Sequence, residues 1–187
     1  MGATTKFGYD PAGNLTQVND PLGHTHTNTY DANNRVTSTT DPSGAKMGFT
    51  WDGLDRIIRV TDQQNAVTGF TFDASSNLTT LTAANGVSTQ YTYDLMNRLS
   101  TVTDGGGATT QYTYDEHGNL ASITDPLDRV TSLTWDDGDN LTSVTTPAGA
   151  LEEWIYDPVN RVTQNVKPGG CHNKVWVRPS WEPHPGE

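Results

Sequence analysis

The pattern of hydrophobic and polar positions repeats along the chain with a period of 21 residues. Each unit carries an aromatic residue followed directly by aspartate, and the spacing holds without insertion or deletion. The pairs are Tyr9-Asp10, Tyr30-Asp31, Trp51-Asp52, Phe72-Asp73, Tyr93-Asp94, Tyr114-Asp115, Trp135-Asp136 and Tyr156-Asp157. Self-similarity at a fixed interval is the signature of repeat architectures, so the pattern predicts a tandem array.

Two short runs in each unit have the character of β-strands. The first run has an aliphatic residue six positions after the aromatic and usually another three positions later, as in Leu120 and Ile123. The second run alternates, with Tyr112 and Tyr114 two positions apart and therefore on one face of a strand. We expect two antiparallel strands per unit. The three-residue step in the first run is interpreted as a β-bulge or as a strand end near a turn.

Glycine, asparagine and aspartate mark two tight turns in every unit. They stand four and fourteen positions after the aromatic, with Ser76 as the exception, and they tolerate positive φ. At the second of these positions glycine occurs as Gly23, Gly44, Gly86, Gly107, Gly149 and Gly170. The segment Asp20-Pro21-Leu22-Gly23 has the residue preferences of a type I turn, and its Asp side chain is expected to accept hydrogen bonds from backbone N–H groups ahead of it.

Composition supports an all-β fold. Hydrophobic residues make up 33% of the chain, and 10 Pro and 18 Gly are scattered along it, so long helices would be interrupted. Chaining the hairpins through short turns predicts a curved antiparallel meander of tandem β-hairpins. A single unit cannot bury its own apolar face, so neighbouring units are expected to stabilise one another by stacking.

Charge and local composition exclude several classes of function. The formal net charge of -11 argues against binding to nucleic acid or to an anionic membrane, because both require a basic patch. No run of apolar residues is long enough for membrane insertion, and the N-terminal residues lack the pattern of a signal peptide. The single cysteine, Cys171, excludes an internal disulfide and a multi-cysteine metal site.

The repeat unit resembles that of the YD-repeat or RHS-repeat family. The resemblance is carried by Tyr9-Asp10, Gly13-Asn14-Leu15-Thr16 and Asp20-Pro21-Leu22-Gly23, and again by Tyr114-Asp115, Gly118-Asn119-Leu120 and Asp125-Pro126. It implies a segment of a spiral β-sheet shell that, in toxin members of the family, encloses a toxin or another polypeptide. It also implies further repeats of a longer polypeptide as partners and a secreted or cell-surface location.

The period defines the expected organisation of the chain. Residues 1–170 form the repeat array, which begins half-way through a unit, and residues 171–187 depart from the period as a non-repeat tail. We interpret the chain as a piece of a longer array. Nothing in the sequence matches the closing region that carries an aspartyl autoprotease in toxin members of the family.

The acidic residues are best explained as turn caps. Thirteen of the 17 Asp fall at the two turn positions of the repeat. The alternative is that some rows of Asp also hold cations, for which residues 136–140 form the densest cluster, but that cluster lacks the spacing of a calcium-binding loop. We expect no metal requirement for folding.

Other candidate sites are weak. His24 and His26 are two positions apart without a third ligand nearby, and Cys171 beside His172 lacks a third group that would orient a nucleophile pair. Sequons at Asn14, Asn77 and Asn140 share one repeat position, which favours repeat composition over glycosylation. We therefore assign no catalytic residue, cofactor or metal ligand and expect no enzymatic activity.

The rows of aromatic residues leave two functions open. Cross-strand packing of the rings suits a structural wall that shields or carries a toxin or other polypeptide. Exposed rings would instead suit an extracellular carbohydrate-binding or cell-contact adhesion module that contacts surface glycans. The two hypotheses differ in whether the aromatic side chains are engaged within the sheet or presented to solvent.

Overall fold

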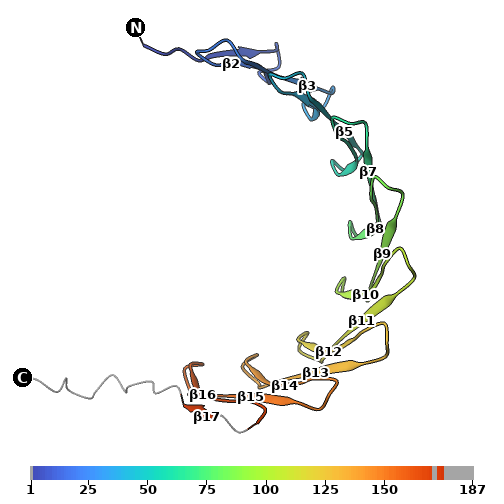
Figure 1. Cartoon of the computed structure of the whole chain (residues 1–187), viewed down its shortest axis with the longest axis vertical. Coiled ribbons are helices and arrows are strands. Elements are labelled where there is room, and N and C mark those ends of the chain that lie inside the picture. The colour runs from blue at the N-terminus through green and yellow to red at the C-terminus, as the bar shows by residue number, and fades with distance from the viewer. Residues whose placement is uncertain (1, 170–171, 175–187) are drawn as a thin grey trace, which may run out of the picture. The chain divides into compact units, whose positions relative to one another are not determined.

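The computed structural model describes residues 2–169 and 172–174. Backbone contacts divide the chain into two compact units, Met1–Thr92 and Tyr93–Glu187, and each is considered by itself. Both consist of β-strands joined by short turns (Figure 1). The described segments contain no helix with the length and apolar character that crossing a membrane requires.

Long and short strands alternate along the chain. In the first unit they are β1 (Lys6–Tyr9), β2 (Leu15–Asn19), β3 (Thr25–Tyr30), β4 (Val36–Thr40), β5 (Lys46–Trp51), β6 (Ile57–Thr61), β7 (Val67–Phe72), β8 (Leu78–Thr82) and β9 (Ser88–Tyr93), which ends one residue into the second unit. The following strands are β10 (Leu99–Thr103), β11 (Thr109–Tyr114), β12 (Leu120–Thr124), β13 (Val130–Trp135), β14 (Leu141–Thr145), β15 (Leu151–Tyr156), β16 (Val162–Val166) and β17 (His172–Lys174).

Within each unit, every strand pairs antiparallel with the next one in the sequence. Examples are β2 with β3 and β3 with β4 in the first unit, and β11 with β12 and β12 with β13 in the second. The predicted all-β meander of hairpins is therefore confirmed. The last pairing, between β16 and β17, extends the sheet into the expected tail, most of which lies outside the described residues.

The three-residue step in each short strand is a β-bulge. In the hairpin of β1 and β2, Tyr9 pairs with Leu15 and Gly8 pairs with Gln17, so Thr16 is an extra residue. The next pair is Phe7 with Val18. Because one residue is skipped, the two aliphatic side chains of the short strand lie on the same face as the aromatic side chains of the long strand.

Both turns of a unit have the same geometry. In the first, the Gly13 N–H donates to the Asp10 carbonyl at 3.0 Å and the Asp10 N–H donates to the Asn14 carbonyl at 3.0 Å. This is a type I turn followed by a residue with positive φ, a common three-residue hairpin loop. Positive φ occurs at Gly13, Asn34, Asp55, Ser76, Asn97, Gly118, Asp139 and Asn160, and at Gly23, Gly44, Asn65, Gly86, Gly107, Asp128 and Gly149. Gly170 lies outside the described residues, and its neighbour Gly169 has a φ of 94°.

The sheet has no buried hydrophobic core in its described part. Only Ser38, 5% exposed, is buried, and most apolar strand residues are half-buried. A single layer of sheet covers its apolar side chains only with their neighbours on the same face. Stability therefore depends on turns and on contacts between successive hairpins.

Replacing Gly23 by alanine should lower the free energy of unfolding by about 1 kcal/mol, because φ is 89° and L-residues are strained there. No atom lies within 4 Å of the added Cβ, so the penalty comes from the backbone alone. Gly23→Val should cost more. The control is Gly53→Ala. A Cβ at Gly53 also has no atom within 4 Å, but the φ of Gly53 is not positive, so this variant should leave stability unchanged. Denaturant melts that show equal effects for the two alanine variants would contradict the turn geometry.

Candidate functional site

The aspartate after each aromatic residue closes its own turn with one carboxylate oxygen. Asp31 Oδ1 accepts the backbone N–H groups of Asn33 at 2.9 Å and Arg35 at 3.0 Å. Asp136 makes the same pair of bonds within the acidic cluster of residues 136–140. Charge-assisted bonds to backbone N–H groups favour the ionised form, so these carboxylates act as caps.

The second carboxylate oxygen binds the residue four positions on, which is always Asn or Arg in the first turn. Arg35 donates from Nε to Asp31 Oδ2 at 2.8 Å. Its Nη1 also reaches the next unit, where it donates to the Asp52 carbonyl and to Asp55 Oδ1, both at 2.7 Å. We call this connection, from one first-turn aspartate through Asn or Arg to the next first turn, the inter-repeat tie.

Asparagine makes a shorter version of the tie. Asn14 donates from Nδ2 to Asp10 Oδ2 at 2.9 Å and to Asn34 Oδ1 at 2.8 Å. Asn140 bonds Asp136 and Asn160 in the same way. The amide nitrogens at the sequons Asn14, Asn77 and Asn140 are thus engaged within the array. The repeat itself explains why asparagine stands there.

The aromatic residue connects each unit to the bulge of the unit before it. Tyr30 donates its hydroxyl to the Leu15 carbonyl at 2.8 Å, and Trp51 donates Nε1–H to the Val36 carbonyl at 2.7 Å. These carbonyls belong to the residues that begin the bulges, where the ladder of backbone bonds is interrupted. The same bond recurs from Tyr114 to Leu99, from Trp135 to Leu120 and from Tyr156 to Leu141.

Arginine ties also stack on the aromatic residue of the next unit. The guanidinium carbon lies 4.7 Å from the ring centroid of Phe72 for Arg56 and 4.3 Å from that of Tyr114 for Arg98. A cation over an aromatic face within about 6 Å is attracted by the ring quadrupole. Phe72 has no polar group to donate to a carbonyl, so the stack supplies the connection that Tyr and Trp make by hydrogen bonding.

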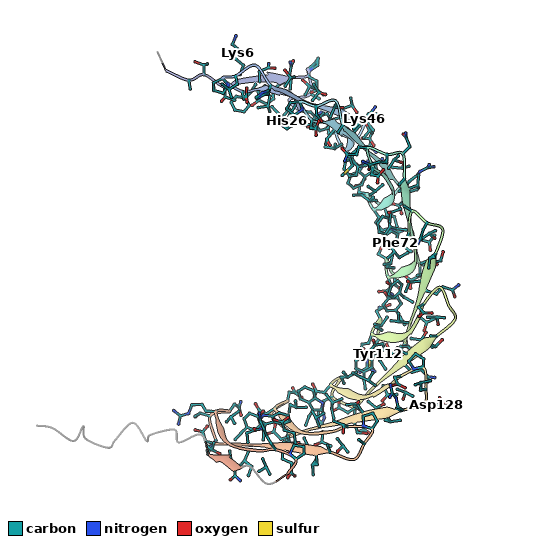
Figure 2. The ribbon with its side chains drawn as sticks, viewed as in Figure 1. Lys6, His26, Lys46, Phe72, Tyr112 and Asp128 are labelled. Carbon is teal, nitrogen blue, oxygen red and sulfur yellow. The ribbon has the colours of Figure 1, made fainter. Side chains whose placement is uncertain are left out.

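The two faces of the sheet differ in chemistry. One face carries the aromatic and aliphatic residues, such as Tyr112 and Ile123, which pair across β11 and β12. The other face carries hydroxyl groups, such as Thr113, which bonds Ser122 at 2.6 Å. Figure 2 shows the same alternation in the first unit, where Phe72 and Lys46 lie on opposite sides of the ribbon. We call these the aromatic face and the hydroxyl face.

The remaining candidate residues do not assemble into a reactive site. Nδ1 of His24 donates to Asp20 Oδ2 at 2.7 Å at the end of a turn, while His26 lies on β3. No group of three or more His, Cys, Asp or Glu side chains that could hold a metal occurs within the described part of the chain. Cys171 and the side chain of His172 lie outside the described part of the structure.

The sequence pattern did not predict the inter-repeat tie, nor the hydrogen bond from each Tyr or Trp to the bulge carbonyl of the preceding unit. The signal for the tie was present, because Asn14, Arg35, Arg56, Asn77, Arg98, Asn119, Asn140 and Arg161 occupy one repeat position without exception. The sequence alone identifies this position only as part of the repeat motif. Its chemical function depends on a partner 17 to 20 residues away, which only the strand register reveals.

The chain matches a known repeat family over most of its length. The RHS Repeat family matches residues 1–25, 30–67, 51–88, 72–110, 98–130 and 114–151. The chain belongs to the RHS repeat family. Among curated proteins, no relative matches this RHS sequence.

Several solved structures have a similar fold. The crystal structure of TcdB2-TccC3 without its hypervariable C-terminal region has a TM-score of 0.49 and 18% identity, and the match covers 87% of this RHS chain and 11% of that chain. A crystal structure of TcdB2-TccC3 has a TM-score of 0.47 and 16% identity, and the match covers 88% of this RHS chain and 14% of that chain. A Tc holotoxin pore of Photorhabdus luminescens has a TM-score of 0.38 and 15% identity, and the match covers 88% of this RHS chain and 13% of that chain. This RHS chain therefore spans a small part of these much longer chains.

Acidification should destabilise the array through the caps. The hydrogen bond from Arg35 lowers the pKa of Asp31, and that from Arg129 lowers the pKa of Asp125. A group with a lowered folded pKa contributes stability above its unfolded pKa of about 3.9 and loses it as the pH falls through the folded value. The melting temperature should therefore drop as the pH falls below about 4.

Two variants test this origin of the pH dependence. Asp125→Asn keeps an oxygen that can cap the turn but does not titrate, so the variant should show a weaker dependence on pH. Asp137→Asn is the control, because the Asp137 carboxylate caps no turn among the described residues. An equal change in both pH profiles would show that the caps are not responsible.

Replacing Tyr114 by phenylalanine removes the hydroxyl that donates to the Leu99 carbonyl at 2.9 Å. The free energy of unfolding should fall by about 1 kcal/mol, the net value of a typical intramolecular hydrogen bond. The control is Tyr9→Phe, because Tyr9 is 62% exposed and its hydroxyl has no partner in the described part of the chain. Equal stability of the two variants in denaturant melts would exclude the bulge carbonyl as an important contact.

Proposed function

We propose that this RHS array is a structural, non-catalytic segment of a shell wall that encloses or carries a toxin or other polypeptide. The observation that supports the proposal best is the difference between the two faces. The aromatic face carries half-buried apolar side chains without a covering layer of protein, whereas the hydroxyl face carries Thr and Ser side chains that bond one another. This asymmetry suits a wall with a polypeptide on one side and water on the other.

The connections between units also suit a wall. Inter-repeat ties such as that of Arg35 join successive first turns, and rings such as Trp51 join each unit to the bulge before it. Both contacts fix the spacing of neighbouring hairpins without a core. A sheet of this kind can be lengthened by further units of the same sequence pattern, so we take further RHS repeats as its partners.

The location follows from the same proposal. A wall that carries a toxin acts outside the cell that makes it, so we propose a secreted or cell-surface location as part of a larger protein. The alternative, an adhesion module that binds surface glycans, requires rings presented to solvent. The rings of Tyr30, Trp51 and Trp135 instead use their polar atoms on carbonyls within the sheet. Engagement of the rings favours the wall.

A photo-cross-linking amino acid at Tyr112 should capture an unfolded polypeptide, and the same group at Thr113 should not. The two residues are adjacent on β11 but lie on the aromatic and the hydroxyl face, respectively. The probe is a synthetic unfolded polypeptide of zero net charge that is rich in leucine and serine. Equal capture from both positions would contradict a sided wall, and binding to a glycan array with no capture would favour the adhesion module.

A further inference from the structure

The hairpin of β3 and β4 departs from the repeat on the aromatic face. The position two residues before the aromatic usually forms an aromatic–aliphatic pair with the opposite strand, as in Phe49 and Val60. In this hairpin the equivalent pair is Asn28 and Thr39. Two short polar side chains leave space that a ring fills elsewhere, and a hollow of about 400 Å³ opens there with Met47 on its wall.

Two turn aspartates stand at the rim of the hollow, Asp41 and Asp62. The Oδ1 atom of Asp41 caps its turn by accepting from the Ser43 and Ala45 N–H groups, and that of Asp62 accepts from the Gln64 N–H. Neither Oδ2 atom has a hydrogen-bond or ion-pair partner among residues 2–169. Each aspartate therefore offers one free carboxylate oxygen beside the hollow.

Equivalent turns elsewhere in the chain show what such an oxygen binds. Asp125 caps its turn in the same way, and its Oδ2 accepts from Nε and Nη2 of Arg129, both at 2.7 Å. Asp20 Oδ2 lies 2.7 Å from Nδ1 of His24. In both cases the partner is a basic side chain four residues after the aspartate.

At the hollow this basic residue is missing. Ala45 and Ala66 occupy the position four residues after Asp41 and Asp62. Lys46 and His26 also line the hollow, but neither side chain forms an ion pair or hydrogen bond with Asp41 or Asp62 within residues 2–169. The hollow thus combines space, polar walls and two carboxylate oxygens without a hydrogen-bond or ion-pair partner, with Lys46 and His26 as the basic residues of its lining.

We propose that the hollow is a docking site for an arginine side chain of a partner polypeptide, with its guanidinium on Asp41 Oδ2 in the arrangement that Arg129 adopts on Asp125. Asp62 adds a second negative charge, and Met47 in the lining provides an apolar surface for the stem of the arginine. Arginine is favoured over lysine because its planar guanidinium holds two N–H groups in a fixed arrangement, and Nε and Nη2 of Arg129 both donate to the one free oxygen of Asp125.

This proposal goes beyond the proposed function, because it assigns a specific ligand to one hollow whether or not the chain is part of a shell. A peptide probe therefore tests it on the isolated chain. Failure of the peptide to bind would leave the sidedness of the wall as a separate question, which the cross-linking experiment answers.

The probes are acetyl-Gly-Arg-Gly-amide and the same peptide with citrulline, which has the shape of arginine without its charge. Nuclear magnetic resonance spectra of the full chain should show shifts of the backbone amide signals of residues 41–47 and 62–64 with the arginine peptide. The shifts should weaken with added salt, because the pair is partly exposed. Equal binding of the citrulline peptide would overturn the proposal.

Three variants locate the binding site. Asp41→Asn keeps an oxygen for the turn cap and should weaken binding several-fold. Ala45→Arg supplies the missing basic side chain from the chain itself, so it should abolish binding of the peptide. Asp104→Asn is the matched control, since Asp104 is followed four residues later by Ala108 but lies outside the hollow, and it should leave affinity unchanged.

The controls decide between a site and general attraction to carboxylates. Loss of affinity in Asp104→Asn equal to that in Asp41→Asn would overturn the proposal, as would undiminished binding in Ala45→Arg. Circular dichroism of each variant checks that the sheet is retained. A variant that loses the sheet is replaced by Asp62→Asn, which should weaken binding less than Asp41→Asn does in a folded chain.

Discussion

The carboxylate that follows each aromatic residue is the group on which the rest of the sheet depends. One oxygen closes its own turn, and the other holds the Asn or Arg side chain that reaches the next unit, as Asp31 does for Arg35. Loss of this carboxylate therefore releases a turn and a connection between units together. This double use explains why an acidic residue stands at this position in every unit, although the chain already carries a net charge of -11.

Contacts between neighbouring hairpins replace the core that a single-layer sheet lacks. The bulge is central to them, because it turns both aliphatic side chains of the short strand toward the aromatic face and interrupts the backbone ladder at a carbonyl. Tyr and Trp of the next unit donate to that carbonyl, and their rings lie on the same face of the sheet as the aliphatic side chains. The same side chain thus packs on the aromatic face and gives the bulge carbonyl a hydrogen-bond donor. This explains the preference for aromatic residues with a polar atom.

Local features of this fold could be predicted from the sequence, and contacts between units could not. Turn positions such as Gly23 and Asn97 are marked by residues that tolerate positive φ, so the turns follow from backbone sterics alone. The step from Leu15 to Val18 left a bulge and a strand end as alternatives, because side-chain spacing does not reveal strand pairing. The partners of Arg35 lie 17 and 20 residues away and become apparent only with the register.

Departures from the repeat occur at the second turns, which do not carry the inter-repeat ties. Ala83 lacks a side chain that could cap its turn, and Asn85 instead accepts the Val87 N–H at 3.0 Å. The first turns are joined by inter-repeat ties, so substitutions there would disrupt two units, whereas the second turns mostly close on themselves. Variation in side-chain chemistry is therefore tolerated at the second turns and on the aromatic face beside them. The hollow at Asp41 lies at such a place, where new binding chemistry can arise without loss of the ties that hold the sheet.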